Sequence, residues 1–236
     1  RWRWRQGRAL GIFEKRHDVV QVMGREQPLT RTDASFGRVD RGYQQPALAG
    51  EDDGLAAIEH ATPRGHQRET IRDVYLVPHH SDAITVYPPV LEAIADADII
   101  ILGPGDLFTS IIPNLIVPGL REQLSAVSAP IYHVVNIMTK FGETNHFQAS
   151  DFISTLEGFT GRKLSGAMVN TRRPDDRLLS LYRQQKAEFV NVGYLDEGCQ
   201  LFLEDLLETS GDVIRHDPEK LAGLIERIIA GGPFAT

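Results

Sequence analysis

The stretch DADIIILGPGDLFTSIIPNLIVPGL, residues 96–120, decides the fold class of this 236-residue chain. Residues 98–102 form an apolar run, which is typical of a strand covered on both faces. The turn Gly103-Pro104-Gly105-Asp106 follows, and residues 107–115 then have the character of a helix interrupted by a proline. A buried strand that leads into a helix is the repeating unit of a parallel α/β sheet, so the stretch predicts such a sheet.

The same alternation of strands and helices continues from residue 73 onward. Further strands are predicted at 74–77, 131–135, 164–169 and 189–192, and helices at 89–97, 118–127, 150–158, 174–185 and 218–230. Ser150 is the expected N-cap of the third of these helices. Residues 1–72 lack sustained periodicity, although 10–13 and 19–23 are short apolar pieces compatible with strands. We therefore expect an unassignable N-terminal segment, 1–72, and an α/β domain, 73–236.

Composition narrows the class of protein and its location. Apolar residues make up 42% and charged residues 24%, as in ordinary globular proteins. The single cysteine, Cys199, excludes a disulfide within the chain, which fits a reducing compartment. The apolar runs are far shorter than the roughly 18 residues that a membrane span needs. We expect a cytoplasmic protein without membrane insertion. The formal charge of −7 argues against a nucleic-acid partner.

Ligands of open parallel sheets bind outside the carboxyl ends of the strands. Three predicted connections at that edge are polar: Gly-Pro-Gly-Asp-Leu-Phe-Thr-Ser, then Asn-Ile-Met-Thr-Lys-Phe-Gly-Glu-Thr-Asn-His-Phe, then Asn-Thr-Arg-Arg. The first offers glycines and helix-start amides to an anion, yet it equally fits a plain strand-to-helix turn. The second is longer than the usual 2–6 residues. Its density of polar side chains favours recognition of a sugar or ribose over a solvated loop.

Other candidate sites are weaker. His79, His80 and Asp82 have metal-binding side chains, but a surface loop explains them better. Cys199 has no second cysteine at redox spacing, so a core or surface thiol is expected. The templates of serine hydrolases and zinc proteases are absent from the sequence.

Two long motifs carry a resemblance to a known family. GPGDLFTSIIPNLIVPGL followed by NIMTKFGETNHFQASDF resembles the paired signature of the YvcK-like gluconeogenesis factors, close to GPGSLYTSIIPNLLVPGI and NVMTQPGETDGYTASDH. These proteins share a superfamily with CofD, the 2-phospho-L-lactate transferase, and the likeness covers residues 72–230. It implies a Rossmann-like fold, a cytoplasmic protein and a nucleotide-linked ligand. In the YvcK branch that ligand is a UDP-sugar such as UDP-N-acetylglucosamine, with links to carbon metabolism, cell shape and envelope synthesis. In the CofD branch it is a guanine nucleotide product.

The resemblance also implies site residues. Tyr182 and Arg215 match the family's downstream tyrosine and the arginine of its Arg-His pair. Arg215 is suited to a diphosphate, although a salt bridge to a neighbouring acid is the alternative. Asp106 replaces a usual serine and fits a helix cap, a sugar hydroxyl or a cation better than a phosphate. Carried over by position, the ligand site comprises Gly103, Gly105, Asp106, Thr109, Ser110, Asn136, Thr139, Gly142, Glu143, Thr144, Tyr182 and Arg215.

The sequence also departs from the family pattern. The opening Gly-Gly-Gly-Thr-Gly-Leu loop, the Asp-Asp-Gly-Gly-Ser-Ser segment and the Gly-Asp-x-Arg-Asn motif are missing, so we expect an N-terminally truncated member that lacks the first βα unit. Three readings remain: a regulatory nucleotide-sugar binder with no assigned catalytic residue, a CofD-type transferase using Mg²⁺ held by Asp106, Glu143 and Asp151, or a fragment without ligand competence. A homo-oligomer is compatible with each.

Overall fold

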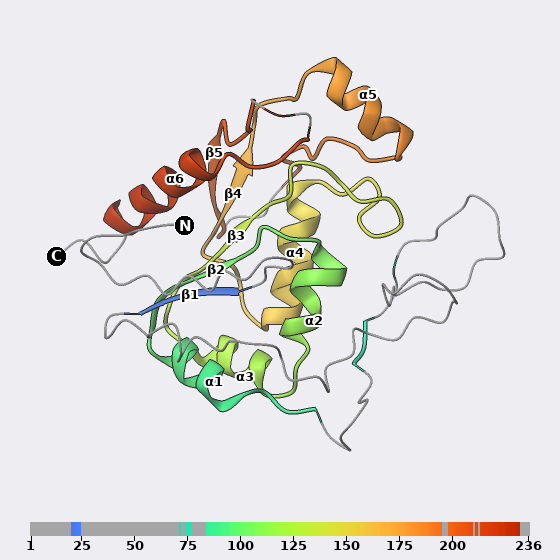
Figure 1. Cartoon of the computed structure of the whole chain (residues 1–236). Helices are drawn as coiled ribbons and strands as arrows, with labels where there is room; N and C mark the ends of the chain where they lie inside the picture. Colours follow the sequence, from blue (N-terminus) through green and yellow to red (C-terminus); the bar gives the residue numbers. More distant parts are fainter. Residues whose placement is uncertain are drawn as a thin grey trace.

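The computed structural model describes residues 71, 74–76, 84–194, 198–209, 211 and 213–231, together with the backbone of 20–24. These residues form one sheet in the order β1-β2-β3-β4-β5 (Figure 1). The four strands β2 to β5 run parallel, and β1 pairs antiparallel with β2. The predicted Rossmann-like parallel sheet is confirmed. The strands are β1 (Val20–Gly24), β2 (Ala97–Leu102), β3 (Ile131–Val134), β4 (Gly166–Asn170) and β5 (Gln200–Glu204).

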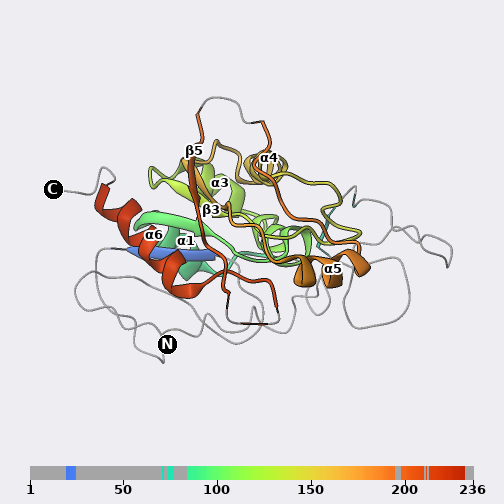
Figure 2. The same ribbon diagram turned by 90° about the horizontal axis from the view of Figure 1, so that it is seen from above.

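Helices cover both faces of this sheet. In Figure 2 the helices α4 and α6 lie on opposite sides of the strands, and in Figure 1 α5 lies beyond the strand ends. None of the described helices is long and apolar enough to cross a bilayer. The helical elements are α1 (Pro88–Ala95), the π-helical turn η1 (Leu107–Ile111), α2 (Ile112–Leu115), α3 (Leu120–Ala126), α4 (Ala149–Thr160), α5 (Asp176–Gln184) and α6 (Pro218–Gly231).

Alternation of side chains along β2 builds two cores, one on each face. Ile100 and Leu102 pack among residues of α1 to α4, whereas Ile99 and Ile101 pack with residues of α6. All four side chains are almost fully buried. Because both faces are covered by helices, the last four positions of the strand are removed from water, and the hydrophobic effect selects a continuous apolar run there.

Two strand predictions were wrong, and one strand was missed. Residues 74–76 have no strand conformation, and Phe189 forms only an isolated bridge with Met138. The fourth parallel strand is instead β5, which pairs with β4 alone among the described strands. Within it, Leu203 is 48% exposed, so the segment lacks the continuous apolar run that marked the central strands.

Helix starts also differ from their predicted positions. Helix α3 begins at Leu120 after Gly119, whose φ is 92°, and not at 118. Helix α4 is capped by Gln148, not by Ser150. The Gln148 side chain accepts from the backbone of Asp151, and the Asp151 carboxylate accepts from the Gln148 N–H at 2.7 Å. This reciprocal pair satisfies two free N–H groups at once, which explains why it prevails over a single serine cap.

Candidate functional site

The turn after β2 passes close over the end of β3. Gly103 is buried and has a φ of 86°, and a Cβ there would lie 3.3 Å from the Val134 carbonyl oxygen. This left-handed conformation near a neighbouring backbone explains the glycine. The Gly103-Pro104 peptide is cis, and half-buried Gly105 leads the chain into η1. The turn therefore brings Asp106 and Thr109 to the carboxyl edge of the sheet.

A shared ion-pair cluster joins the turn after β2 to the loop after β3. The ammonium of Lys140 lies 2.7 Å from Asp106 Oδ2 and 2.5 Å from Glu143 Oε1. It also donates to the Thr109 hydroxyl at 3.3 Å. Asp106 occupies the predicted N-cap position of η1, but its side chain makes no capping bond and pairs with Lys140 instead. The two loops that the sequence singled out thus meet at one place, which we call the Lys140 cluster: Asp106, Thr109, Lys140 and Glu143.

Burial and pairing set the charges of this cluster. Burial raises the pKa of Glu143, and the bonds and charge of Lys140 only partly offset this. Burial also works to lower the pKa of Lys140, but its hydrogen bonds to Asp106 and Glu143 raise the pKa overall. The cluster holds one cation against two carboxylates, and the Asp106 and Lys140 side chains are each 42% exposed. It therefore offers acceptors and a donor to hydroxyl groups rather than a cradle to a bare phosphate.

Several of the predicted polar groups shape the loop after β3. The buried Thr139 donates its N–H to the Glu188 carbonyl at 2.8 Å, and its hydroxyl accepts from the Glu188 N–H at 2.8 Å. The buried Thr144 hydroxyl accepts from the Lys140 N–H at 2.8 Å. The Gly142 N–H donates to the Asn145 side chain at 2.8 Å. These groups position Lys140 and Glu143 through the loop backbone. The half-buried Ser110 lies in η1 beside Thr109.

Tyr182 and Arg215 form a second group near the same loop. The Tyr182 hydroxyl accepts from the Ile214 N–H at 3.1 Å, and both residues pack with Ile137, at the start of the loop after β3, and with Leu207, after β5. The Arg215 guanidinium is exposed and holds both carboxylate oxygens of Glu208, with Nη2 at 3.1 Å from Oε1. The alternative reading of Arg215, a salt bridge to a nearby acid, describes this structure.

Three buried polar atoms lie unpartnered at the carboxyl end of β3 within the described part of the chain. They are Nε2 of His133, Oδ1 of Asn136 and Nε2 of His216. His133 bonds through Nδ1 to the Leu102 carbonyl at 2.9 Å, and His216 forms a hydrogen bond with the backbone of Val135. Sequence reasoning singled out Asn136 but missed both histidines. The signal for His133 was available, because it is the one basic residue within the largely apolar run IYHVV.

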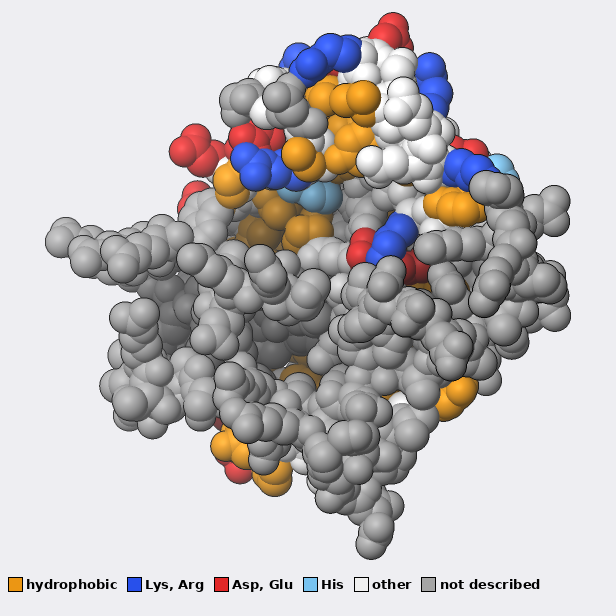
Figure 3. Space-filling view, turned by 45° about the vertical axis from the view of Figure 1, so that its right-hand side comes forward, with side chains coloured by type: hydrophobic (Ala, Val, Ile, Leu, Met, Phe, Trp, Pro, Cys, Tyr) orange, Lys and Arg blue, Asp and Glu red, His pale blue; other side chains and the backbone are white. Residues whose placement is uncertain are grey.

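Both histidines are held neutral. Burial lowers the pKa of His133 to about 4, helped by repulsion from His216, although the bond to Leu102 acts in the opposite direction. Burial likewise lowers the pKa of His216 to about 4. Figure 3 shows a hollow in the surface next to a histidine side chain (pale blue). Side chains of Lys or Arg (blue) and of Asp or Glu (red) lie elsewhere around this hollow. The carboxyl end of β3 therefore presents acceptor atoms without charge.

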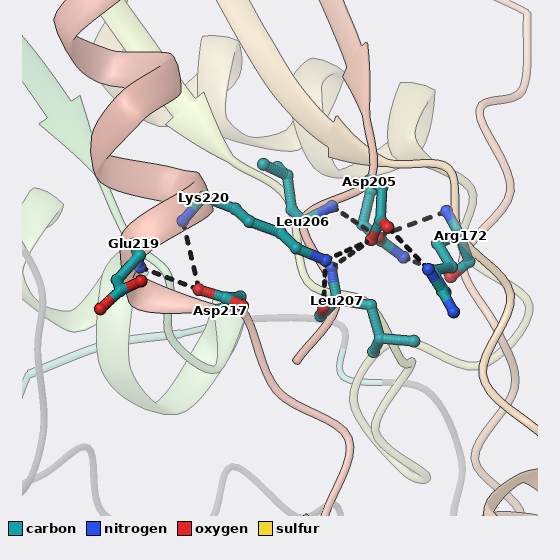
Figure 4. A network of polar contacts seen from close by, with 8 residues as sticks. Arg172, Asp205, Leu206, Leu207, Asp217, Glu219 and Lys220 are labelled. Carbon is teal, nitrogen blue, oxygen red and sulfur yellow. Dashed lines mark hydrogen bonds and ion pairs between the residues drawn. The ribbon is translucent and has the colours of Figure 1, made fainter. Parts of the chain in front are cut away.

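The third polar connection forms a closed network where β4, β5 and α6 meet (Figure 4). Asp205 accepts from Arg172 and from Lys220, each at 3.0 Å. The Lys220 ammonium also donates to the Leu207 carbonyl at 2.8 Å, and Asp217 caps α6 through the N–H groups of Glu219 and Lys220. Arg172 thus links the end of β4 to the end of β5 through Asp205.

The proposed Mg²⁺ ligands do not come together. Asp106 and Glu143 both pair with Lys140, whereas Asp151 serves the cap of α4. Among the described residues, no group of three or more His, Cys, Asp or Glu side chains is arranged to hold a metal ion. His79, His80 and Asp82 lie outside the described residues. Cys199 has a pKa raised to about 11, chiefly by burial, which agrees with an unreactive thiol.

Comparison with known proteins matches the sequence of this chain to one family. A family model described as 2-phospho-L-lactate transferase CofD matches residues 14–207. A protein of Aquifex aeolicus is 40% identical over 194 residues, covering 79% of this chain and 58% of that protein. Proteins named gluconeogenesis factor from Bacillus subtilis and Listeria monocytogenes are 33% and 31% identical. They align over 74% and 79% of this chain, and over 55% and 58% of their own lengths.

The solved structures agree with the sequence matches. Two crystal structures of a UPF0052-family protein of Bacillus halodurans align with TM-scores of 0.60 and 0.59 at 31% and 32% identity. They cover 67% and 66% of this chain and 51% of that protein. The chain spans little more than half the length of these relatives. The family match begins at residue 14, so the likeness extends further toward the N-terminus than the quoted motifs indicate. The chain belongs to the CofD family, and the relatives it resembles include gluconeogenesis factors.

Proposed function

We propose that the chain binds a nucleotide-sugar of the UDP-N-acetylglucosamine class at the carboxyl edge of the sheet, as a regulatory gluconeogenesis factor of the cytoplasm. The observation that carries the proposal is the Lys140 cluster, which joins the loops after β2 and β3 at the edge where parallel sheets bind ligands. The relatives named gluconeogenesis factor support a role in gluconeogenesis.

The chemistry of the edge fits the separate parts of such a ligand. Asp106, exposed and ion-paired, can accept from sugar or ribose hydroxyls, and Lys140 can donate to them. Arg215 holds Glu208 through two bonds, which is the geometry in which a guanidinium binds two phosphate oxygens. Because the side chain is exposed, a diphosphate can replace Glu208 as its partner. The ligand would then extend from the Lys140 cluster toward Arg215.

Calorimetric titration with UDP-N-acetylglucosamine, with and without Mg²⁺, tests the proposal directly. We expect saturable heat from this chain, and we expect Arg215→Ala to weaken binding by about 1.5–3 kcal/mol, the range for hydrogen bonds to charged groups. Arg183→Ala, an exposed arginine of α5, is the matched control and should bind as the parent does. Equal affinity of the Arg215 variant would remove that residue from the site.

A CofD-type transferase is the second candidate, favoured by the description of the matching family model. It would transfer a phospholactyl group from a nucleotide carrier to a deazaflavin acceptor. Formation of the phosphorylated acceptor in the presence of Mg²⁺ would replace the binder proposal with this one. A third outcome is heat from a longer relative but none from this chain, which would identify a fragment without ligand competence.

A further inference from the structure

The unpartnered atoms at the end of β3 all have acceptor character. His133 meets a carbonyl oxygen through Nδ1, so that nitrogen carries the proton and Nε2 presents a lone pair. The His216 ring is likewise fixed by a backbone bond to Val135 while its Nε2 is unpartnered among the described residues. Asn136 adds an amide oxygen from the residue directly after Val135. Three acceptors therefore lie at one strand end, where His133 and His216 are close enough for their charges to repel each other.

These acceptors are built into the protein core. His133 has no exposed surface, and its ring stacks on Phe152 with centroids 6.4 Å apart. Nε2 of His216 and Oδ1 of Asn136 are buried from solvent as well. Buried polar atoms in folded proteins are almost always matched by a partner, so three acceptors unmatched within the described part of the chain point to a bound group as their partner.

We propose that His133, Asn136 and His216 form a subsite that reads neutral N–H and O–H donors of the ligand. The inference rests on the proposed function and states which polar part of that ligand contacts the end of β3. Uncharged acceptors repel a phosphate, because phosphate oxygens are themselves acceptors, so the diphosphate lies away from β3 toward Arg215. The donors come from one of two sources, the imide N–H of a pyrimidine base or the hydroxyl and acetamido N–H groups of the sugar.

The test compares His133→Phe and His216→Phe with the parent chain. Phenylalanine keeps an aromatic ring at the position but removes the Nε2 acceptor, together with the ring N–H that bonds the backbone of Leu102 or Val135. His146→Phe is the control, because the side chain of His146 is 83% exposed and pairs with Glu188. The probes are UDP-N-acetylglucosamine, UMP, N3-methyl-UMP and N-acetylglucosamine-1-phosphate. We expect each core variant to bind UDP-N-acetylglucosamine about tenfold more weakly, as for loss of one hydrogen bond with a buried group left unmatched.

The smaller probes identify the source of the donors. If the base supplies them, N3-methyl-UMP binds the parent about tenfold more weakly than UMP does. If the sugar supplies them, the core variants lose affinity for N-acetylglucosamine-1-phosphate and not for UMP. The methylated probe needs no variant, so a variant that fails to fold does not leave the base arm undecided.

Two results overturn the inference alone. One is unchanged affinity of folded His133→Phe and His216→Phe for UDP-N-acetylglucosamine. In that case the parent still binds the ligand, so the proposed function stands. The other is tight Zn²⁺ binding by the parent that both variants abolish, which would make the site a metal site. If the parent binds none of the probes, the proposed function and the inference both fail.

Discussion

The buried histidines predict a loss of stability in mild acid. Each has a pKa of about 4 in the folded chain, against an ordinary value of 6.5. Between these values the unfolded chain binds more protons than the folded chain, so the free energy of unfolding falls as the pH falls. The contribution is fully present above about pH 6.5 and is lost progressively toward pH 4.

The magnitude follows from the displacement of the two pKa values. A difference of one unit corresponds to about 1.4 kcal/mol, so each histidine contributes at most roughly 3 kcal/mol. Between about pH 7 and pH 5 the expected loss is about 2 kcal/mol for each ring. Repulsion between His133 and His216 acts only when the folded chain takes up protons, at about pH 4, so between about pH 7 and pH 5 the two losses add.

Urea unfolding of the parent and of the double variant His133→Phe/His216→Phe, at about pH 7 and pH 5, measures this loss. We expect the parent to lose about 3–4 kcal/mol more than the double variant over that interval. His146→Phe, which alters an exposed histidine, should follow the parent. If the double variant loses as much stability as the parent, the two rings are not the source of acid sensitivity and the reasoning is refuted.

Four further predictions concern stability measured by urea unfolding. Lys140→Met leaves the buried Glu143 without its cation and should cost about 1–3 kcal/mol; an unchanged midpoint would show that the ion pair contributes nothing net. Gly103→Ala forces a side chain into a φ of 86° and should cost about 1–3 kcal/mol. Gly158→Ala within α4, where a Cβ meets nothing within 4 Å, should gain about 0.5–1 kcal/mol, and a loss there would contradict the argument. Asp217→Ala removes the α6 cap and should cost about 1 kcal/mol, and an unchanged stability would show that the cap contributes nothing net.

The central part of the fold follows from local sequence pattern. β2 was predicted at 98–102 and observed at Ala97–Leu102. The prediction succeeded because a strand that is buried on both faces needs consecutive apolar side chains, which are visible in the sequence. The last helix, predicted at 218–230, was observed at Pro218–Gly231 for a similar reason, since a proline and a preceding aspartate mark its start. β5 escaped prediction because an edge strand exposes part of its surface, and its pattern then resembles that of a loop.

For the candidate site, too, some features follow from the sequence and others only from the tertiary structure. The sequence by itself determined the family, the parallel sheet and the two loops that carry the site, since glycines, hydroxyls and carboxylates in a fixed order are properties of the chain. Only the tertiary structure decided which charges meet. Lys140 lies between Asp106 and Glu143, and His133 shares a strand end with His216, although 82 positions separate the two histidines in the chain. Pairing and burial depend on distance in space, and that distance exists only after β2, β3 and the segment before α6 have packed together.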